Sequence, residues 1–243
     1  MNDFNFDTAI KYSNLSHLIQ EKIVNLSIVV PPVHDFRNKG NRFLNFFSKL
    51  MNQVSFVTKP GGICCLVIDK KPTDATTFFT GEILKILEHE VKSEWHLREE
   101  IMWVKSEKTL AESINKLENG MMTSYDQIPF SHIRIYEKSG SELEYRDRFD
   151  RLASLKISSE KEAMEDSFWY VPPLPYSGYS DHLPREVLVR LITLYSDKGD
   201  FVLDPIAGHG ITGTVAKSLE RRFLCLDSSE ENVFRANERL KYC

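Results

Sequence analysis

Short apolar runs alternate with amphipathic stretches along this chain, and the alternation predicts strands connected by helices. The predicted strands are residues 26–30, 63–68, 95–103, 131–136, 201–203 and 223–227. Helical spacing is found in residues 8–24, 42–57, 78–92 and 184–195, from Thr212 or Thr214 onward, and in residues 229–241. The run from Ile63 to Ile68 has no polar alternation, which is typical of a strand covered on both faces. The pattern predicts an α/β sheet with helices on both faces.

Two segments lack a clear pattern. Residues 105–127 are polar with weak periodicity, and residues 138–167 are the most charged and least apolar part of the chain. The mixed signs of residues 138–167 favour a solvated or mobile excursion over a specific basic surface.

The composition is that of an ordinary globular protein and excludes few functions. The chain has 243 residues, 42% hydrophobic and 27% charged, with a formal net charge of −4. That charge does not indicate nucleic-acid binding, although a local basic face is compatible with it. No apolar run has the roughly 20 residues of a membrane span. The N-terminus is polar and acidic, unlike a signal peptide. A cytoplasmic enzyme or binding protein is expected.

The four cysteines do not indicate a metal site. Cys64 and Cys65 lie inside an apolar run, and neither they nor Cys225 and Cys243 have metal-ligand spacing. We expect reduced thiols in the core and no metal.

The richest chemistry lies in residues 200–213. An apolar run ends in Asp204-Pro205, and a turn with Gly208, Gly210 and Gly213 leads into a helix. Glycine lets a ligand approach the backbone, and the helix start offers free N–H groups to an anionic group. About twenty residues later a second strand ends in Asp227, which is placed to bind ribose hydroxyls. This arrangement predicts a nucleoside-cofactor site. A helix N-cap is the alternative for Asp227, and an exposed loop side chain is the expectation for His209.

A second unusual strand end is Val30-Pro31-Pro32. Proline cannot continue a ladder of backbone hydrogen bonds, so the strand stops here and a polar loop follows. Ligands of such sheets bind at the carboxyl ends of the strands, so both strand ends are candidate site elements.

Together these motifs resemble the β-group amino-methyltransferases, which methylate an exocyclic amine of adenine (N6) or cytosine (N4) in DNA using S-adenosylmethionine. The segment from Val202 to Thr212 resembles the family's cofactor loop, and Arg221–Asp227 resembles the strand that ends in the ribose-binding acid. His182-Leu-Pro-Arg-Glu-Val-Leu resembles, in compressed form, the short motif before that loop. Lys59-Pro-Gly-Gly62 and Ile101-Met-Trp-Val-Lys105 also stand where the family has them. The resemblance covers nearly the whole chain.

The resemblance implies a Rossmann-like methyltransferase sheet with a circularly permuted motif order. It divides the single domain into a catalytic half (1–104), a small target-recognition insertion (105–167) and a cofactor-binding half (168–243). The implied S-adenosylmethionine pocket comprises Asp204, Pro205, Ile206, Gly208, Gly210, Thr212, Asp227, His182, Leu183 and Pro184. It also implies a DNA substrate, a place in restriction-modification, and a cytoplasmic or nucleoid-associated location. A homodimer or a second methyltransferase subunit is compatible with it, and a membrane is not involved.

The Pro-Pro motif departs from the family. Its usual form is Asp, Asn or Ser, then Pro-Pro, then an aromatic residue, so that a side chain and a prolyl carbonyl accept hydrogen bonds from the target amine. The aromatic ring stacks on the flipped-out base. Here the motif is Val30-Pro31-Pro32-Val33, which keeps the Pro31 carbonyl but lacks both side-chain groups. His34, Asp35 or Phe36 could replace them from the following loop.

Three readings of the function therefore stay open. The first is an active amino-methyltransferase with a rearranged site, and the second is a cofactor- or nucleic-acid-binding subunit that supports an active partner. An RNA-directed methyltransferase is the third. A dehydrogenase is disfavoured, because the loop lacks the Gly-x-Gly-x-x-Gly spacing. The candidate nucleic-acid contacts are Phe36, Arg37, Lys39, Lys105 and Lys108, and within the insertion also Lys116, Arg146, Arg148 and Arg151.

Overall fold

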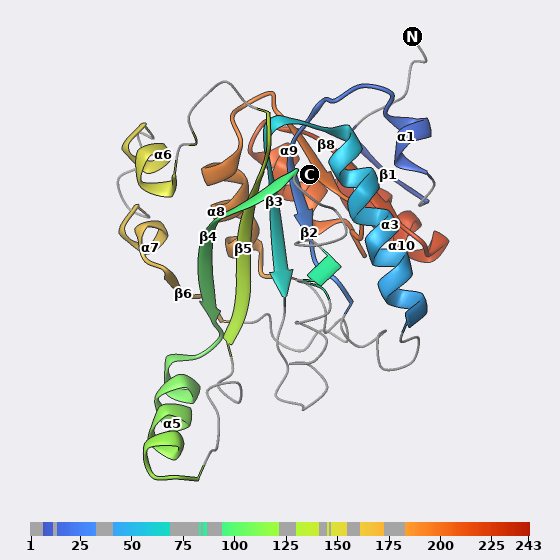
Figure 1. Cartoon of the computed structure of the whole chain (residues 1–243). Coiled ribbons are helices and arrows are strands. Elements are labelled where there is room, and N and C mark those ends of the chain that lie inside the picture. Colours follow the sequence, from blue (N-terminus) through green and yellow to red (C-terminus); the bar gives the residue numbers. More distant parts are fainter. Residues whose placement is uncertain are drawn as a thin grey trace.

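The computed structural model describes most of the chain (Figure 1). The described residues are 7–11, 14–32, 41–68, 83, 85–86, 94–121, 130–140, 145, 147–154, 161–172 and 183–243. Within these ranges, no helix is both long and apolar enough to cross a membrane.

The strands form one mixed sheet whose order in space differs from their order in the chain. The strands are β1 (Thr8–Lys11), β2 (Val24–Val29), β3 (Thr58–Ile68), β4 (Trp95–Val104), β5 (Phe130–Lys138), β6 (Phe168–Tyr170), β7 (Phe201–Asp204) and β8 (Arg222–Asp227). Their spatial order is β1-β8-β7-β2-β3-β5-β4-β6. Among the described strands, β5 alone runs antiparallel to its neighbours, which are β3 and β4. The predicted α/β class is confirmed.

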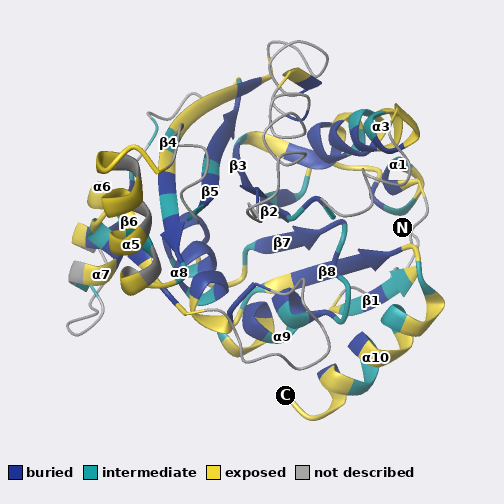
Figure 2. Cartoon of the chain, turned by 90° about the horizontal axis from the view of Figure 1, so that it is seen from below, coloured by how far each residue is buried: buried dark blue, intermediate teal, exposed yellow. Residues whose placement is uncertain are grey.

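Helices cover both faces of this sheet (Figure 2). The helices are α1 (Leu15–Leu18), α3 (Asn41–Val57), α5 (Glu107–Glu118), α6 (Arg148–Ser154), α7 (Lys161–Glu165), α8 (Arg185–Tyr195), α9 (Ile211–Ser218) and α10 (Glu230–Lys241). Side chains of α1 and α3 pack with Leu66, Leu203 and Leu224 on one face. Side chains of α8, α9 and α10 pack with Leu26, Cys65 and Phe223 on the other. Alternate residues of β3, β7 and β8 thus enter different cores, which explains their apolar runs.

The N-terminal helix prediction is wrong. Residues 8–24 contain the short strand β1 and the single-turn helix α1 instead of one helix. The backbone of β1 pairs with β8, more than 200 residues away in sequence, and the Asn237 side chain binds both the N–H and the carbonyl of Ala9. These long-range bonds outweigh the weak local helical pattern.

The prediction of a solvated or mobile excursion at residues 138–167 is also wrong for its described part. The helices α6 and α7 each direct an apolar side chain, Leu152 and Met164, into the core beneath α8. In addition, α5 lies within the segment that showed weak periodicity, and β5 lies inside the sheet between β3 and β4. The described residues between 105 and 167 therefore include one helix, a strand inside the sheet and two packed helices.

Candidate functional site

The two unusual strand ends lie next to each other. Strand β7 pairs in parallel with β2, with Val202 beside Leu26 and Leu203 beside Ser27. Both strands therefore end at the same edge, where Asp204-Pro205 and Val30-Pro31-Pro32 meet. From β7 the chain continues through α9 to β8, and from β2 it continues through α3 to β3, in opposite directions along the sheet. Such a reversal leaves a crevice at the carboxyl edge, the usual ligand position in open α/β sheets.

Asp204 anchors the glycine loop. Its side chain is buried, and its two oxygens accept hydrogen bonds from the Ile206 N–H (3.1 Å) and from the Thr212 hydroxyl (2.5 Å). These bonds join the start of the loop to the first turn of α9. Burial raises the pKa of Asp204 to about 7, although both hydrogen bonds oppose the increase. Both oxygens of Asp204 thus accept hydrogen bonds from its own loop and from the helix that follows.

Two glycines are required where the loop turns. Gly208 and Gly210 have φ values of 52° and 71°, in the left-handed region that other residues rarely adopt. A Cβ atom on Gly210 would lie 2.6 Å from the Cβ of Ala236 on α10. Their backbone conformation, and for Gly210 also the contact with α10, therefore excludes side chains at these two positions, as the sequence predicts for a loop that a ligand approaches closely.

Asp227 closes the loop from the end of β8. One oxygen accepts a hydrogen bond from the Gly208 N–H (2.9 Å), and the other accepts from the Ser229 N–H (2.8 Å) and the Asn232 amide (3.0 Å). The N-cap of α10 is Ser229, whose hydroxyl accepts from the Asn232 N–H, so the N-cap alternative for Asp227 is wrong. A carboxylate has about four acceptor positions, which leaves one for a further donor.

The other predicted cofactor residues lie either just before α8 or in the loop itself. Leu183 and Pro184 are buried immediately before α8, and Ile206 packs partly buried beside the core under α3. Pro205 is buried, whereas His182 lies outside the described residues. His209 is half-buried rather than fully exposed, and burial together with Arg235 and Arg239 lowers its pKa. The sequence did not indicate the hydrogen bond between Asn232 and Asp227. Asn232 follows four polar residues, and nothing in that run distinguishes its side-chain amide.

The Pro-Pro end presents an apolar surface. Val30 is partly buried and packs against the core beneath α8, and Pro31 is buried. No polar side chain stands at position 30, as the sequence indicates. Val33, His34, Asp35, Phe36, Arg37 and Lys39 lie outside the described residues.

The candidate phosphate contacts fall into two groups. Lys105 lies just before α5, and Lys108 lies in its first turn. Helix α5 projects beyond the edge at which β2 and β3 end (Figure 1). The Lys105 ammonium lies 5.1 Å from the centre of the Trp103 ring, and Lys108 is 86% exposed. By contrast, Arg148 is buried and is not a surface contact. Arg151 is partly exposed, and its guanidinium donates to the Leu194 carbonyl. Arg146 lies outside the described residues.

The cysteines follow their prediction with one exception. Cys64, Cys65 and Cys225 are buried free thiols, whereas Cys243 is exposed at the last position. Burial raises the pKa of the Cys64 thiol to about 12, so it is un-ionised at neutral pH.

Comparison with protein families gives one match over most of the chain. Residues 34–238 match the family described as DNA methylase. The matched range includes the glycine loop, Asp227 and α5.

Individual relatives match over different lengths. The Type II methyltransferase M2.DpnII of Streptococcus pneumoniae is 43% identical over 58 residues, which cover 24% of this chain and 22% of that enzyme. The Type II methyltransferase M.HpaI of Haemophilus parainfluenzae is 22% identical over 91% of this chain and 69% of its own length. The match to the first of these relatives thus spans about a fifth of its length.

Solved structures share the fold over nearly the whole chain. A protein of Thermus thermophilus described as a DNA modification methylase, complexed with S-adenosyl-L-methionine, has a TM-score of 0.69 and 20% identity. The alignment covers 97% of this chain and 95% of that protein. The cytosine-N4-specific PvuII DNA methyltransferase has a TM-score of 0.66 and 13% identity, with 98% and 94% of the two chains covered. The Rossmann-like fold of this chain is thereby established.

The burial of Asp204 leads to a pH-dependent stability. Folded Asp204 holds its proton up to about pH 7, whereas in the unfolded chain it ionises near its ordinary value of 3.8. Between these values the folded state binds more protons, so stability falls as pH rises. We expect the free energy of unfolding of the wild type, relative to Asp204→Asn, to decrease from pH 5 to pH 7 and then level off. The full decrease is at most about 4 kcal/mol. Urea unfolding of both proteins at several pH values measures this decrease. A difference in free energy of unfolding that does not change with pH would contradict the prediction.

The turn at Gly210 gives a second prediction. Gly210→Ala should lose about 1 kcal/mol to the left-handed backbone and a further 1–3 kcal/mol to the overlap with Ala236. Gly199→Ala is the matched control, because Gly199 has φ 83° with no atom within 4 Å of its added Cβ. It should lose only the backbone contribution. Chemical unfolding measures both variants, and equal losses would show that the contact with α10 is not restrictive.

Proposed function

This chain belongs to the DNA methylase family, and on that premise we propose that it transfers a methyl group from S-adenosylmethionine to an exocyclic amine of adenine or cytosine in DNA. The observation that carries the proposal is the glycine loop at the strand-order reversal, with Asp227 at the end of the next strand. The Pro31 carbonyl stands at the adjacent strand end, where a target base would have to enter.

The residues at the loop fit the cofactor. Asp227 has one acceptor position left for a ribose hydroxyl, and the loop backbone is kept bare by Gly208 and Gly210. Leu183, Pro184 and Ile206 supply apolar surface nearby, while Asp204 and Thr212 act as positioning residues that hold the loop to α9. S-adenosylmethionine supplies the activated methyl group when it is bound.

The base-binding side would depend on the Pro31 carbonyl and on the loop after Pro32. A carbonyl that accepts a hydrogen bond from the target amine keeps the nitrogen lone pair directed at the methyl group. Val30 contributes apolar contact only. His34, Asp35 and Phe36 remain the candidates for a second acceptor and a stacking ring.

DNA would lie across the carboxyl edge of the sheet. We assign target recognition to the segment 105–129, because α5 projects past that edge (Figure 1). Lys105 and Lys108 would contact phosphates there, together with Arg37 and Lys39. The described charges of α5 are balanced, with Lys108 3.9 Å from Glu112. The charges of α5 would therefore contribute little to the affinity for DNA.

A supporting subunit is the second candidate function, and the surroundings of Val30 favour it. Val30 packs partly buried against the core and offers no hydrogen-bond acceptor at the strand end where the target amine would be held. A chain of this kind would bind cofactor or DNA within a homodimer or beside a second methyltransferase subunit.

The ribose assignment predicts a specific loss of cofactor affinity. Asp227→Ala should weaken S-adenosylmethionine binding about tenfold to a hundredfold, the effect of losing a hydrogen bond to a charged group. Asn232→Ala is the matched control, because it removes one bond to Asp227 and leaves the carboxylate in place. Its affinity should change less than about threefold. Isothermal titration calorimetry measures both, and equal affinity of Asp227→Ala and wild type would refute the assignment.

The missing acceptor at position 30 predicts a gain of activity. Val30→Asn should accelerate methyl transfer about tenfold or more, since one oriented hydrogen bond at a reacting group contributes roughly 10²–10³ in rate. Val30→Leu, which adds no acceptor, is the control. Transfer of tritium from labelled cofactor to mixed-sequence DNA, with RNA in parallel, measures the rate. Cofactor binding without transfer by either protein would favour the supporting-subunit function, and transfer to RNA alone would change the substrate class.

A further inference from the structure

Helix α6 turns its two arginine side chains inward or along α8. Arg148 is 4% exposed, and its guanidinium donates to the Ser167 hydroxyl at 2.8 Å. Arg151 donates to the Leu194 carbonyl at 3.2 Å and lies over the Tyr195 ring. In addition, Arg190 of α8 donates to the Ala163 carbonyl of α7 at 3.0 Å. The cations at this interface therefore join α6, α7 and α8 to one another.

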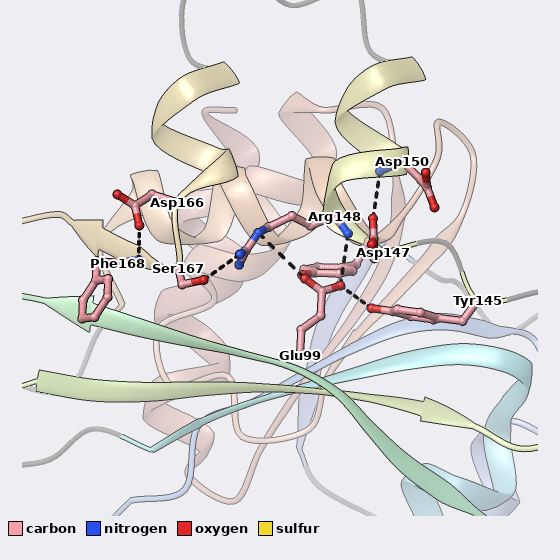
Figure 3. A network of polar contacts seen from close by, with 9 residues as sticks. Glu99, Tyr145, Asp147, Arg148, Asp150, Asp166, Ser167 and Phe168 are labelled. Atoms are coloured by element: carbon pink, nitrogen blue, oxygen red, sulfur yellow. Dashed lines mark hydrogen bonds and ion pairs between the residues drawn. The ribbon is translucent and has the colours of Figure 1, made fainter.

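Glu99 is the centre of this interface (Figure 3). Its side chain extends from β4, and one oxygen accepts hydrogen bonds from the Tyr145 hydroxyl and from the Arg148 N–H (3.1 Å). The other oxygen accepts from the Tyr195 hydroxyl (3.3 Å) and lies 3.9 Å from the Arg148 guanidinium. One partly buried carboxylate thus connects β4, the start of α6 and the end of α8.

The position of α8 affects the cofactor loop. Pro184 precedes α8, and its carbonyl accepts from the Leu188 N–H at 3.3 Å. Arg185 in the first turn donates to the Ser218 hydroxyl of α9, and α9 begins at the glycine loop. A shift of α8 would therefore move Leu183, Pro184 and α9 together. The helices α6 and α7 lie beside β4 and β6, away from the edge past which α5 projects (Figure 1).

We propose that α6 and α7 brace α8 for cofactor binding and do not read DNA, and that Glu99 is a positioning residue for the cofactor pocket. The proposal rests on the proposed function, because it concerns the S-adenosylmethionine pocket. It assigns to Glu99, Tyr145 and Tyr195 an effect on cofactor affinity although none of them lies in the glycine loop. It also separates the two parts of the segment 105–167, with α5 facing DNA and α6 and α7 supporting the cofactor half.

Two conservative variants test the brace. Tyr195→Phe and Tyr145→Phe each remove one hydroxyl from Glu99, the first from α8 and the second from the segment before α6. Tyr170→Phe is the matched control, because Tyr170 is 44% exposed on β6. Isothermal titration calorimetry with S-adenosylmethionine gives the cofactor affinity, and fluorescence anisotropy with a mixed-sequence duplex gives the DNA affinity. Thermal unfolding confirms that each variant is folded at the measuring temperature.

We expect Tyr195→Phe and Tyr145→Phe to weaken cofactor binding about fivefold, the effect of one ordinary hydrogen bond, with DNA affinity within about twofold of wild type. Tyr170→Phe should change neither affinity. Unchanged cofactor affinity in both folded variants overturns the brace, as does a loss of DNA affinity alone in Tyr145→Phe. A wild type that binds no cofactor overturns the proposed function itself, so the two failures are distinguishable.

Discussion

The buried carboxylate of Asp204 is the constraint on which the glycine loop depends. It ends β7 in the interior and accepts from Ile206 and Thr212, so the chain must turn sharply and enter α9 within a few residues. Gly208 and Gly210 follow from that turn, because two left-handed positions are needed to complete it. The Gly208 N–H then reaches Asp227, which joins β7, α9, β8 and α10 at one point.

The two halves of the carboxyl edge differ in how fully their polar groups are organised. On the β7–β8 side, each carboxylate has defined donors, and one acceptor position of Asp227 remains for a ligand. On the β2 side, Val30 packs into the core and leaves a backbone carbonyl as the polar group of the strand end. A site of this kind can bind its cofactor and still transfer the methyl group slowly. Activity and cofactor binding are therefore separate questions for this chain.

Local patterns predicted the elements whose burial is strongest and left the others undetected. The apolar runs of β2, β3, β7 and β8 and the faces of α3 and α8 were found because they pack in two cores. The strand β1 was predicted as a helix, since its four residues become a strand only through β8 and Asn237. The charged composition of α6 and α7 indicated solvent exposure, although Arg148 is buried against Glu99. Charge alone does not show whether a partner lies in the core.

The order of residues was sufficient to establish the α/β class, the glycine loop with its two acids, and the altered Pro-Pro motif. Each depends on residue type and short spacing, which are properties of the chain itself. Only the tertiary structure brought β7 beside β2 and placed Asp204 in the interior with Thr212. It also directed Arg148 toward Glu99, 49 residues away in sequence. Pairings over such distances are decided by burial and strand order, which no local pattern encodes.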